Sequence, residues 1–190
     1  VYANSDGAWI LEERPMAAVH LMATARQGSD VQQLADGVSS PGGYETVLGH
    51  EEMARGLARR AADLLEAQPV AGGVYPVVCD PELAGVFAHE AFGHLSEADF
   101  VYANPQAAEM MVLGRAFGAP SLTIIDDGTL PGLRGTHRYD DEGSPTQRTE
   151  LLRDGVLVGR LHYARRPPAW ENAPPAMRGL SAIAMLPSCA

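Results

Sequence analysis

The sequence predicts an α+β (mixed α/β) fold, in which a sheet comes first, helices follow and a hairpin comes last. Three observations support this class: extended apolar runs before residue 28, a helical pattern over residues 50–68, and two alternating runs joined by Asp154-Gly155. With 190 residues, of which 46% are hydrophobic, the chain can form one domain or two small ones.

The N-terminal segment is predicted to form a strand, a turn and two further strands. Residues 1–11 alternate around an "SDG" turn signal, and residues 15–28 continue as an extended apolar run that ends in glycine. From His50 to Gln68, apolar residues recur at helical spacing with arginines on the remaining face. We therefore expect a sheet followed by an amphipathic helix.

A second helix is predicted to carry the chemistry of the protein. Residues 75–79 form a short apolar run that predicts a buried strand. Asp80 follows as a helix cap, with Pro81 at the first helical position. The helix that begins there is expected to end near His94.

The second half of the chain is predicted to form a shorter helix and then strands. Residues 107–117 have a helical pattern, and residues 121–127 form a β-branched strand that ends in an Asp-Gly turn. Residues 146–163 predict a hairpin, because Asp154-Gly155 is a pair that accepts positive φ in a two-residue turn. After Tyr163 the sequence becomes proline-rich and shows no sustained period.

His89, Glu90 and His94 form an H-E-x-x-x-H motif at the far end of the second helix. Imidazole binds zinc well, and a nearby carboxylate can take a proton from a water molecule that the metal acidifies. Residues five apart diverge by about 140° on a regular α-helix, so the helix must widen or end near His94 for both rings to reach one ion. The alternative is an ordinary helix end with two structural histidines and a solvated glutamate.

Composition excludes several classes of partner. A net charge of −10 and a pI near 4.9 leave no basic surface for nucleic acid, and they also disfavour an anionic membrane surface. The two cysteines lie far apart and form no metal knuckle, which favours a reducing cytoplasm. No run is long enough for a membrane helix, no signal peptide is evident, and the first residue is Val1, so we expect the chain to begin inside a longer protein.

Two long stretches, "HEAFGHLSEADFV" and "LGRAFGAPSLTIIDDGTLPGLRGTHRYDDEGSPTQRTELLRDGVLVGRLH", resemble the TldD/PmbA family of metallopeptidases, on the TldD side that keeps H-E-x-x-x-H. The resemblance extends from about Val1 to His162. It implies an α/β N-terminal domain that holds the histidine helix, here residues 1–120, and the start of a β-rich C-terminal domain, residues 121–163.

The resemblance implies a zinc-dependent hydrolase that cleaves unstructured peptides inside a closed dimer, either a homodimer or a heterodimer with a PmbA-like subunit. His89 and His94 would be zinc ligands and Glu90 the general base, although iron or manganese also suits this ligand set. The family's third ligand is a C-terminal-domain cysteine with no match here, so activity of this chain is expected to be impaired. The alternative is a non-catalytic subunit or decayed remnant that only pairs with a full-length relative.

Residues 164–190 are predicted to be a frameshifted, disordered tail of a chain truncated at both ends. Family members continue with a stretch resembling "MGERPTGNARAIS". For one choice of codons, reading this stretch one base later yields "WENAPPAMRGLSA", identical to residues 170–182. Cys189 would then lie in shifted sequence and would not be the family's zinc cysteine.

Other polar residues are weaker candidates. Asp126, Asp127 and the acidic run at residues 140–142 could orient metal ligands or bind a substrate amine, but such clusters more often form turns. His137 and His162 are further possible ligands without a supporting motif.

Overall fold

The structure is a computed structural model, and it describes residues 1–162 and 183–184. Its contacts divide the chain into two compact units. Of the described residues, the first unit comprises 1–12, 78–131, 135–162 and 183–184, and the second comprises 13–77 and 132–134. The α+β class is confirmed, whereas the domain boundaries at residues 120 and 163 stay predictions.

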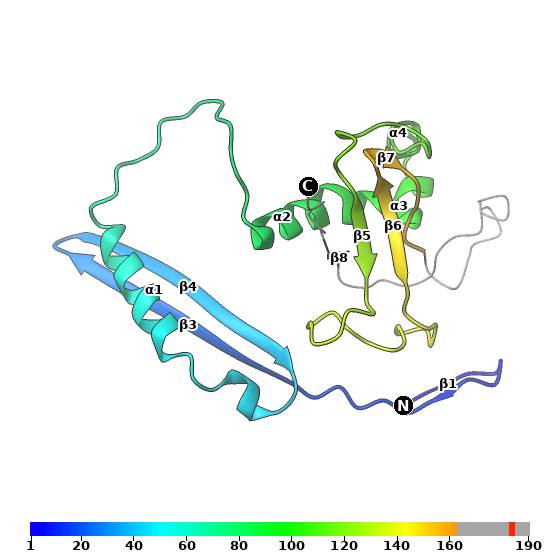
Figure 1. Ribbon diagram of the computed structural model, residues 1–190, viewed down its shortest axis with the longest axis horizontal. Coiled ribbons are helices and arrows are strands. Elements are labelled where there is room, and N and C mark those ends of the chain that lie inside the picture. The colour runs from blue at the N-terminus through cyan, green and yellow to red at the C-terminus, as the bar shows by residue number, and fades with distance from the viewer. Residues whose placement is uncertain (163–182, 185–190) are drawn as a thin grey trace. The chain divides into compact units, whose positions relative to one another are not determined.

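The second unit is a long hairpin covered on one face by a helix (Figure 1). Strands β3 (Met16–Gln27) and β4 (Asp30–Pro41) pair antiparallel along their whole length. A short 3-10 turn, η1 (Tyr44–Val47), leads to α1 (Glu51–Asp63), which buries Leu57 and Ala61. The helix is also joined to the hairpin by an ion pair, in which Arg60 Nη2 lies 2.7 Å from Asp36 Oδ2. Hydrogen bonding from this arginine lowers the pKa of the Asp36 carboxyl.

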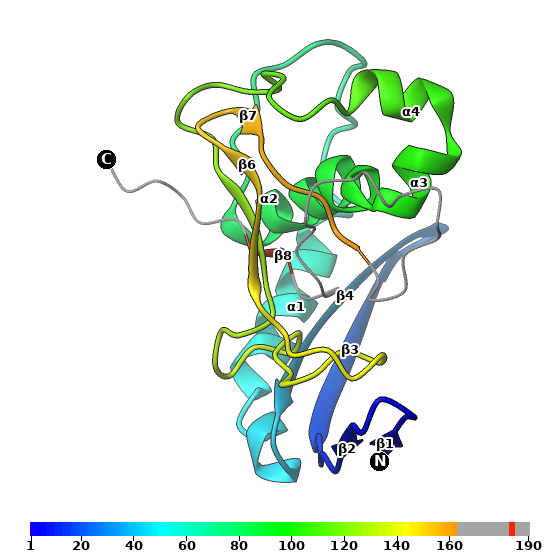
Figure 2. The same cartoon turned by 90° about the vertical axis from the view of Figure 1, so that its right-hand side faces the viewer.

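The first unit contains an antiparallel sheet in the order β7-β6-β5-β8. Its strands are β5 (Ile124–Asp127), β6 (Arg148–Arg153), β7 (Val156–Leu157) and β8 (Ile183–Ala184). Figure 1 shows β5 and β6 side by side, and Figure 2 views these strands nearly edge-on. Asp154 and Gly155 both have positive φ, 51° and 78°, so the predicted two-residue hairpin turn is confirmed.

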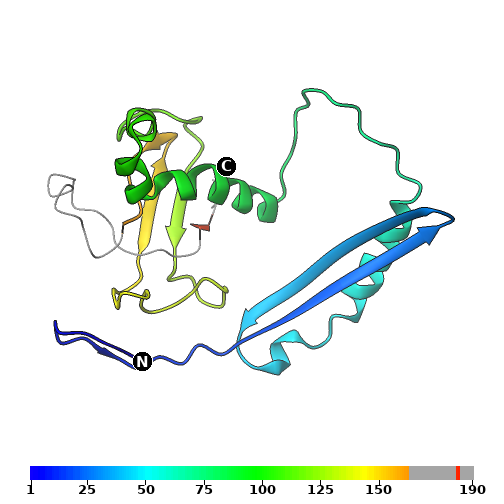
Figure 3. The same cartoon turned by 180° about the vertical axis from the view of Figure 1, so that it is seen from behind.

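Helices of the first unit pack on this sheet. They are α2 (Pro81–Ala88), the π-helical turn η2 (His89–Gly93), the 3-10 turn η3 (His94–Ser96), α3 (Ala98–Ala103) and α4 (Pro105–Met110). Figure 3 shows α2 leading directly into η2 and η3. The buried apolar residues that join helices to sheet are Ala88, Val101, Met111, Ile124, Leu151, Leu152, Leu157 and Leu161. Among the described residues, no helix is long and apolar enough to cross a membrane.

One predicted element has other bounds in the structure and one was wrong. The helix expected at residues 107–117 already begins at Pro105, after its cap Asn104, and ends at Met110. It ends there because Met111, with a φ of −90° and a ψ of 52°, leaves the helical conformation. The strand expected at residues 75–79 does not form.

The segment at residues 75–79 lacks a strand to pair with among the described residues. Its valines, Val77 and Val78, are exposed to 78% and 101%. An apolar run forms a strand only where a neighbouring strand completes the ladder, so periodicity alone overpredicted this element.

Strand pairing at the N-terminus agrees with the prediction. Strands β1 (Tyr2–Ala3) and β2 (Trp9–Ile10) pair antiparallel across the expected turn. The side chain of Asn4 stabilises the turn by accepting hydrogen bonds from the backbone amides of Asp6 and Ala8 at 3.0 Å each.

Candidate metal centre

The helix that carries the motif starts at the cap predicted from the sequence. Asp80 accepts a hydrogen bond from the Leu83 amide at 2.8 Å, and Pro81 occupies the first turn, where no amide donor is needed. These two residues determine where α2 begins. Ala88, the last residue of α2, is buried in the core and anchors the helix on the sheet side.

The helix widens at the motif itself. The backbone amide of His94 donates to the carbonyl of His89, which is an i→i+5 bond, and residues 89–93 form a π-helical turn. This bond places residues five apart above one another, whereas on a regular α-helix they would diverge by about 140°. The local widening that the H-E-x-x-x-H spacing required is therefore confirmed.

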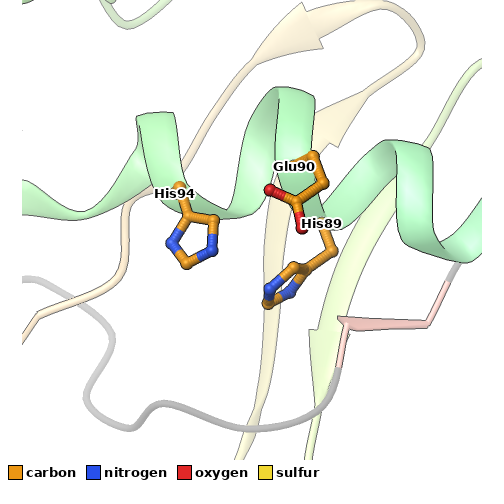
Figure 4. Close-up of side chains that lie close together, drawn as sticks. All are labelled: His89, Glu90 and His94. Atoms are coloured by element: carbon orange, nitrogen blue, oxygen red, sulfur yellow. The ribbon is translucent and has the colours of Figure 1, made fainter.

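The three motif side chains lie together (Figure 4). One ligand-type atom from each of His89, Glu90 and His94 can be chosen so that all lie within 4.8 Å of one another. The two imidazole rings have centroids 4.6 Å apart and meet edge to face at 72°. All three side chains are exposed, so a solvent ion or a substrate can reach them.

The donor set fits a zinc ion. Two imidazoles and a carboxylate are ligand types that zinc accepts, and with bonds of about 2.0–2.1 Å two ligand atoms on one ion lie at most about 4.2 Å apart. The chosen atoms lie within 4.8 Å of one another, so rotation of the exposed side chains has to bring them into that range. Three protein ligands are usual at a catalytic zinc, so when Glu90 is kept free as a base the two histidines leave one ligand position to be filled.

Glu97 contacts the cluster although it was not among the candidates predicted from the sequence. Its Oε1 lies 2.9 Å from Nδ1 of His94, and its side chain is 28% exposed, against 55% for the histidine. Carboxylates commonly hold metal-ligating histidines in this way. An acidic residue three positions after the second histidine is the sequence signal that could have indicated it.

Of the remaining acidic candidates, Asp127 and the run at residues 140–142 form turns, as the sequence favoured, whereas Asp126 is fully buried within strand β5. Asp127 accepts hydrogen bonds from the amide and hydroxyl of Thr129, at 2.9 and 2.6 Å. Asp140 accepts from the amides of Glu142 and Ser144, at 2.9 and 2.7 Å. Both carboxylates are therefore used in the architecture of the loop between β5 and β6.

Among the described residues, the other candidate ligands do not belong to the cluster. Among the described residues, the group of metal-type side chains contains neither His137 nor His162. The His137 ring lies 2.8 Å from the carbonyl of Gly135, and His162 is buried. The thiol of Cys79 is free and exposed, and Cys189 and the predicted shifted tail lie outside the described residues apart from 183–184.

Comparisons with known proteins point to one family. The model of the PmbA/TldA metallopeptidase central domain matches residues 1–68, and that of the PmbA/TldA metallopeptidase C-terminal domain matches residues 72–174. The histidine helix therefore falls within the match to the C-terminal domain.

Curated relatives agree with these matches. A metalloprotease of Synechocystis is 47% identical over 166 residues, which is 84% of this chain and 35% of the relative. A protein named zinc metalloprotease TldD homolog, from Saccharolobus solfataricus, is 28% identical over 97% of this chain and 43% of its own length. The chain thus spans about a third to two fifths of the length of these relatives.

The fold also matches solved structures. A crystal structure from Thermotoga maritima, described as a proposed modulator of a DNA gyrase, superposes with a TM-score of 0.63 at 25% identity. The superposition covers 77% of this chain and 33% of that one.

Proposed function

Because the chain belongs to the PmbA/TldD family of metallopeptidases, we propose that His89, Glu90 and His94 form the metal centre of a zinc-dependent peptide hydrolase. The observation that carries the proposal is the π-helical turn, which aligns two histidines that a regular helix would separate. The name of the Saccharolobus relative supports zinc as the metal.

Each motif residue has a distinct role in the proposed site. His89 and His94 hold the ion through ring nitrogens, and Glu90, one residue further along the turn, accepts the proton of the attacking water and later delivers it to the leaving amine. Zinc, when bound, acts as a Lewis acid on the peptide carbonyl. Because all three side chains are exposed, an extended peptide can approach them without unfolding of the protein.

The proposal for the whole protein goes beyond this chain. By family resemblance, a cysteine from a further part of the protein completes the ligand set, and unstructured peptides are cut inside a closed dimer with an identical or PmbA-like subunit. We expect this chain alone to bind zinc weakly and to turn over little, because it supplies two histidine ligands. The free thiol of Cys79 suits a reducing compartment such as the cytoplasm.

Zinc binding tests the proposal directly. We expect calorimetric titration to show one zinc site. We expect His89→Ala and His94→Ala each to abolish zinc binding, because a single histidine cannot hold the ion. Glu90→Gln should retain zinc while any peptide cleavage falls by about 10²- to 10⁴-fold, since the general base is lost. Glu82→Gln removes an exposed carboxylate of the same helix and should change neither property.

Equal zinc binding by the wild type and by a variant that carries both His89→Ala and His94→Ala would overturn the assignment. The assignment would also be overturned if the wild-type chain took up no zinc at concentrations that saturate a site with two histidine ligands.

A non-catalytic subunit is the second candidate. It is favoured by exposed apolar side chains on one helix: Leu83, Val86 and Phe87 of α2 are all more than half exposed. Exposed apolar side chains gathered on one short helix are typical of a surface that another protein covers. Light scattering of the chain mixed with a full-length relative tests the subunit, because a stable complex that forms without zinc supports it. A zinc-dependent cleavage of peptides supports the enzyme instead.

A further inference from the structure

The hydrogen bond between Glu97 and His94 selects one form of the histidine ring. A neutral imidazole carries its hydrogen on one nitrogen and a lone pair on the other, and only the lone pair binds a metal. A carboxylate 2.9 Å from Nδ1 accepts the Nδ1 hydrogen, which leaves the lone pair on Nε2. In free neutral histidine the hydrogen is mostly on Nε2, so the contact with Glu97 favours the tautomer that is otherwise the minor one.

Glu97 is itself held in place by the backbone on both sides. The Leu161 amide donates to the Ser96 carbonyl at 2.8 Å, and the Ala98 amide donates to the Leu161 carbonyl at 2.9 Å. These two bonds form a parallel bridge between Glu97 and Leu161. Ser96 and Ala98 are fully buried, and Leu161 is 4% exposed.

The Glu97 backbone also begins the next helix. Its amide donates to the His94 carbonyl at 3.3 Å, and its carbonyl accepts from Val101 at 3.0 Å as the N-cap of α3. The carboxylate therefore projects from a backbone that is hydrogen-bonded on both sides, between η3 and α3, rather than from a free loop. Such rigidity is what a group needs if it is to orient a ligand before the metal arrives.

His89 provides a contrast within the same site. Its ring makes no hydrogen bond to another described residue, although it lies 4.6 Å from the ring of His94. The two histidines are therefore unequal: one is oriented in advance and the other is free to adjust.

We infer that Glu97 is a positioning residue that fixes the Nδ1–H tautomer of His94 and presents its Nε2 to the metal, with Leu161 as the anchor that holds Glu97 in register. This inference rests on the proposed function for its biological meaning. The tautomer itself is a property of the metal-free chain, so it can be measured whether or not zinc binds.

The test is the tautomer of His94 in the full chain. Long-range ¹H–¹⁵N correlation spectra at about pH 8, where an ordinary histidine is neutral, report which ring nitrogen carries the hydrogen. We expect Nδ1–H in the wild type and a mixture dominated by Nε2–H in Glu97→Ala. Glu97→Gln keeps an acceptor oxygen and should keep the wild-type tautomer, and Glu109→Ala removes an exposed acid of α4 and should change nothing.

Nε2–H at His94 in the wild type would overturn the inference, and so would an unchanged tautomer in Glu97→Ala. The wild-type spectrum alone is decisive if the alanine variant fails to fold. The His89 signals serve as an internal reference and should not respond to either substitution.

Zinc titration separates this inference from the proposed function. We expect zinc affinity to fall by about 10- to 100-fold in Glu97→Ala and to recover largely in Glu97→Gln. If the wild type binds no zinc but His94 shows the Glu97-dependent tautomer, the proposed function fails and the positioning role stands. If zinc binds equally to the wild type and to Glu97→Ala, the positioning role fails and the metal site stands.

Discussion

The number of residues between His89 and His94 determines what this helix can bind. With four residues between them, the histidines meet only because residues 89–93 take one i→i+5 turn. The sequence indicated that some widening was needed, since the geometry of a regular helix excludes a shared ion. It did not indicate Glu97, because the partner of a histidine depends on where the chain goes after the helix, and that path is fixed by Leu161, 64 positions later.

Gly155 is a residue of the first unit whose backbone leaves no room for a side chain. Its φ is 78°, and an added Cβ would lie 2.3 Å from the Gly118 carbonyl oxygen and 2.7 Å from that of Ala119. We expect Gly155→Ala to lower the free energy of unfolding by about 3 kcal/mol or more, as the sum of left-handed strain and a backbone clash.

Gly114 is the matched control for this prediction. It has a φ of 88°, but an added Cβ would meet nothing within 4 Å. Gly114→Ala should therefore cost only about 1–2 kcal/mol, the strain of the left-handed backbone alone. Urea unfolding of both variants measures the difference, and equal costs would show that the clash at Gly155 is relieved by a shift of residues 118–119.

At the scale of elements, local signals identified the turns and caps but not the strand partners. The hairpin turn at Asp154-Gly155 and the helix start at Asp80 are determined by two or three adjacent residues, so a sequence window contains them entirely. Strand β4 (Asp30–Pro41) carries polar residues on both faces and gave no periodic signal, yet it pairs with β3 over twelve positions. Residues 75–79 show the reverse, since they have a strand pattern but pair with no strand in the part of the chain that the structure describes.

The ion pairs on β6 predict a pH dependence of stability. Hydrogen bonds from Arg148, and secondly from Arg153, lower the pKa of the Glu150 carboxyl. A lowered pKa in the folded state means that the group stabilises the fold above its unfolded pKa, about 4.3, and that this contribution disappears as the pH falls through the lowered value. The Arg148–Glu150 distance is 2.8 Å, and both arginines are largely exposed.

We therefore expect Glu150→Gln to lower the free energy of unfolding by about 0.5–1 kcal/mol at neutral pH, the range of pairs near a surface. The difference between variant and wild type should shrink below about pH 4 and vanish once Glu150 is protonated in both states. Urea unfolding of the wild type and of Glu150→Gln at a series of pH values measures this difference in free energy, with Glu109→Gln on α4 as the control. A difference that grows with acidification would contradict the assigned direction of the pKa shift.

At the scale of the whole molecule, the chain consists of two units with very unequal cores. The unit that carries the histidine helix buries eight apolar side chains in one cluster between helices and sheet. In the hairpin unit, the fully buried apolar residues are Leu57 and Ala61, both on α1. Composition alone could not reveal this imbalance, because residues that contribute to the 46% hydrophobic content also lie on exposed surfaces such as Val78 and Phe87.

The hairpin unit should therefore depend on a single side chain. Leu57 is 2% exposed and lies where α1 covers the hairpin, and replacing a buried leucine by alanine costs about 2–5 kcal/mol. A helix on a two-stranded hairpin has little stability in reserve, so we expect Leu57→Ala to unfold residues 13–77 while the histidine helix stays folded. Hydrogen exchange followed by mass spectrometry should show lost protection in β3 and β4 and unchanged protection in β5 and β6. Val31→Ala, at a 47% exposed position of β4, should leave both units protected. If Leu57→Ala removes protection from β5 and β6 as well, the two units fold as one cooperative body, and the metal site then depends on the hairpin for its stability.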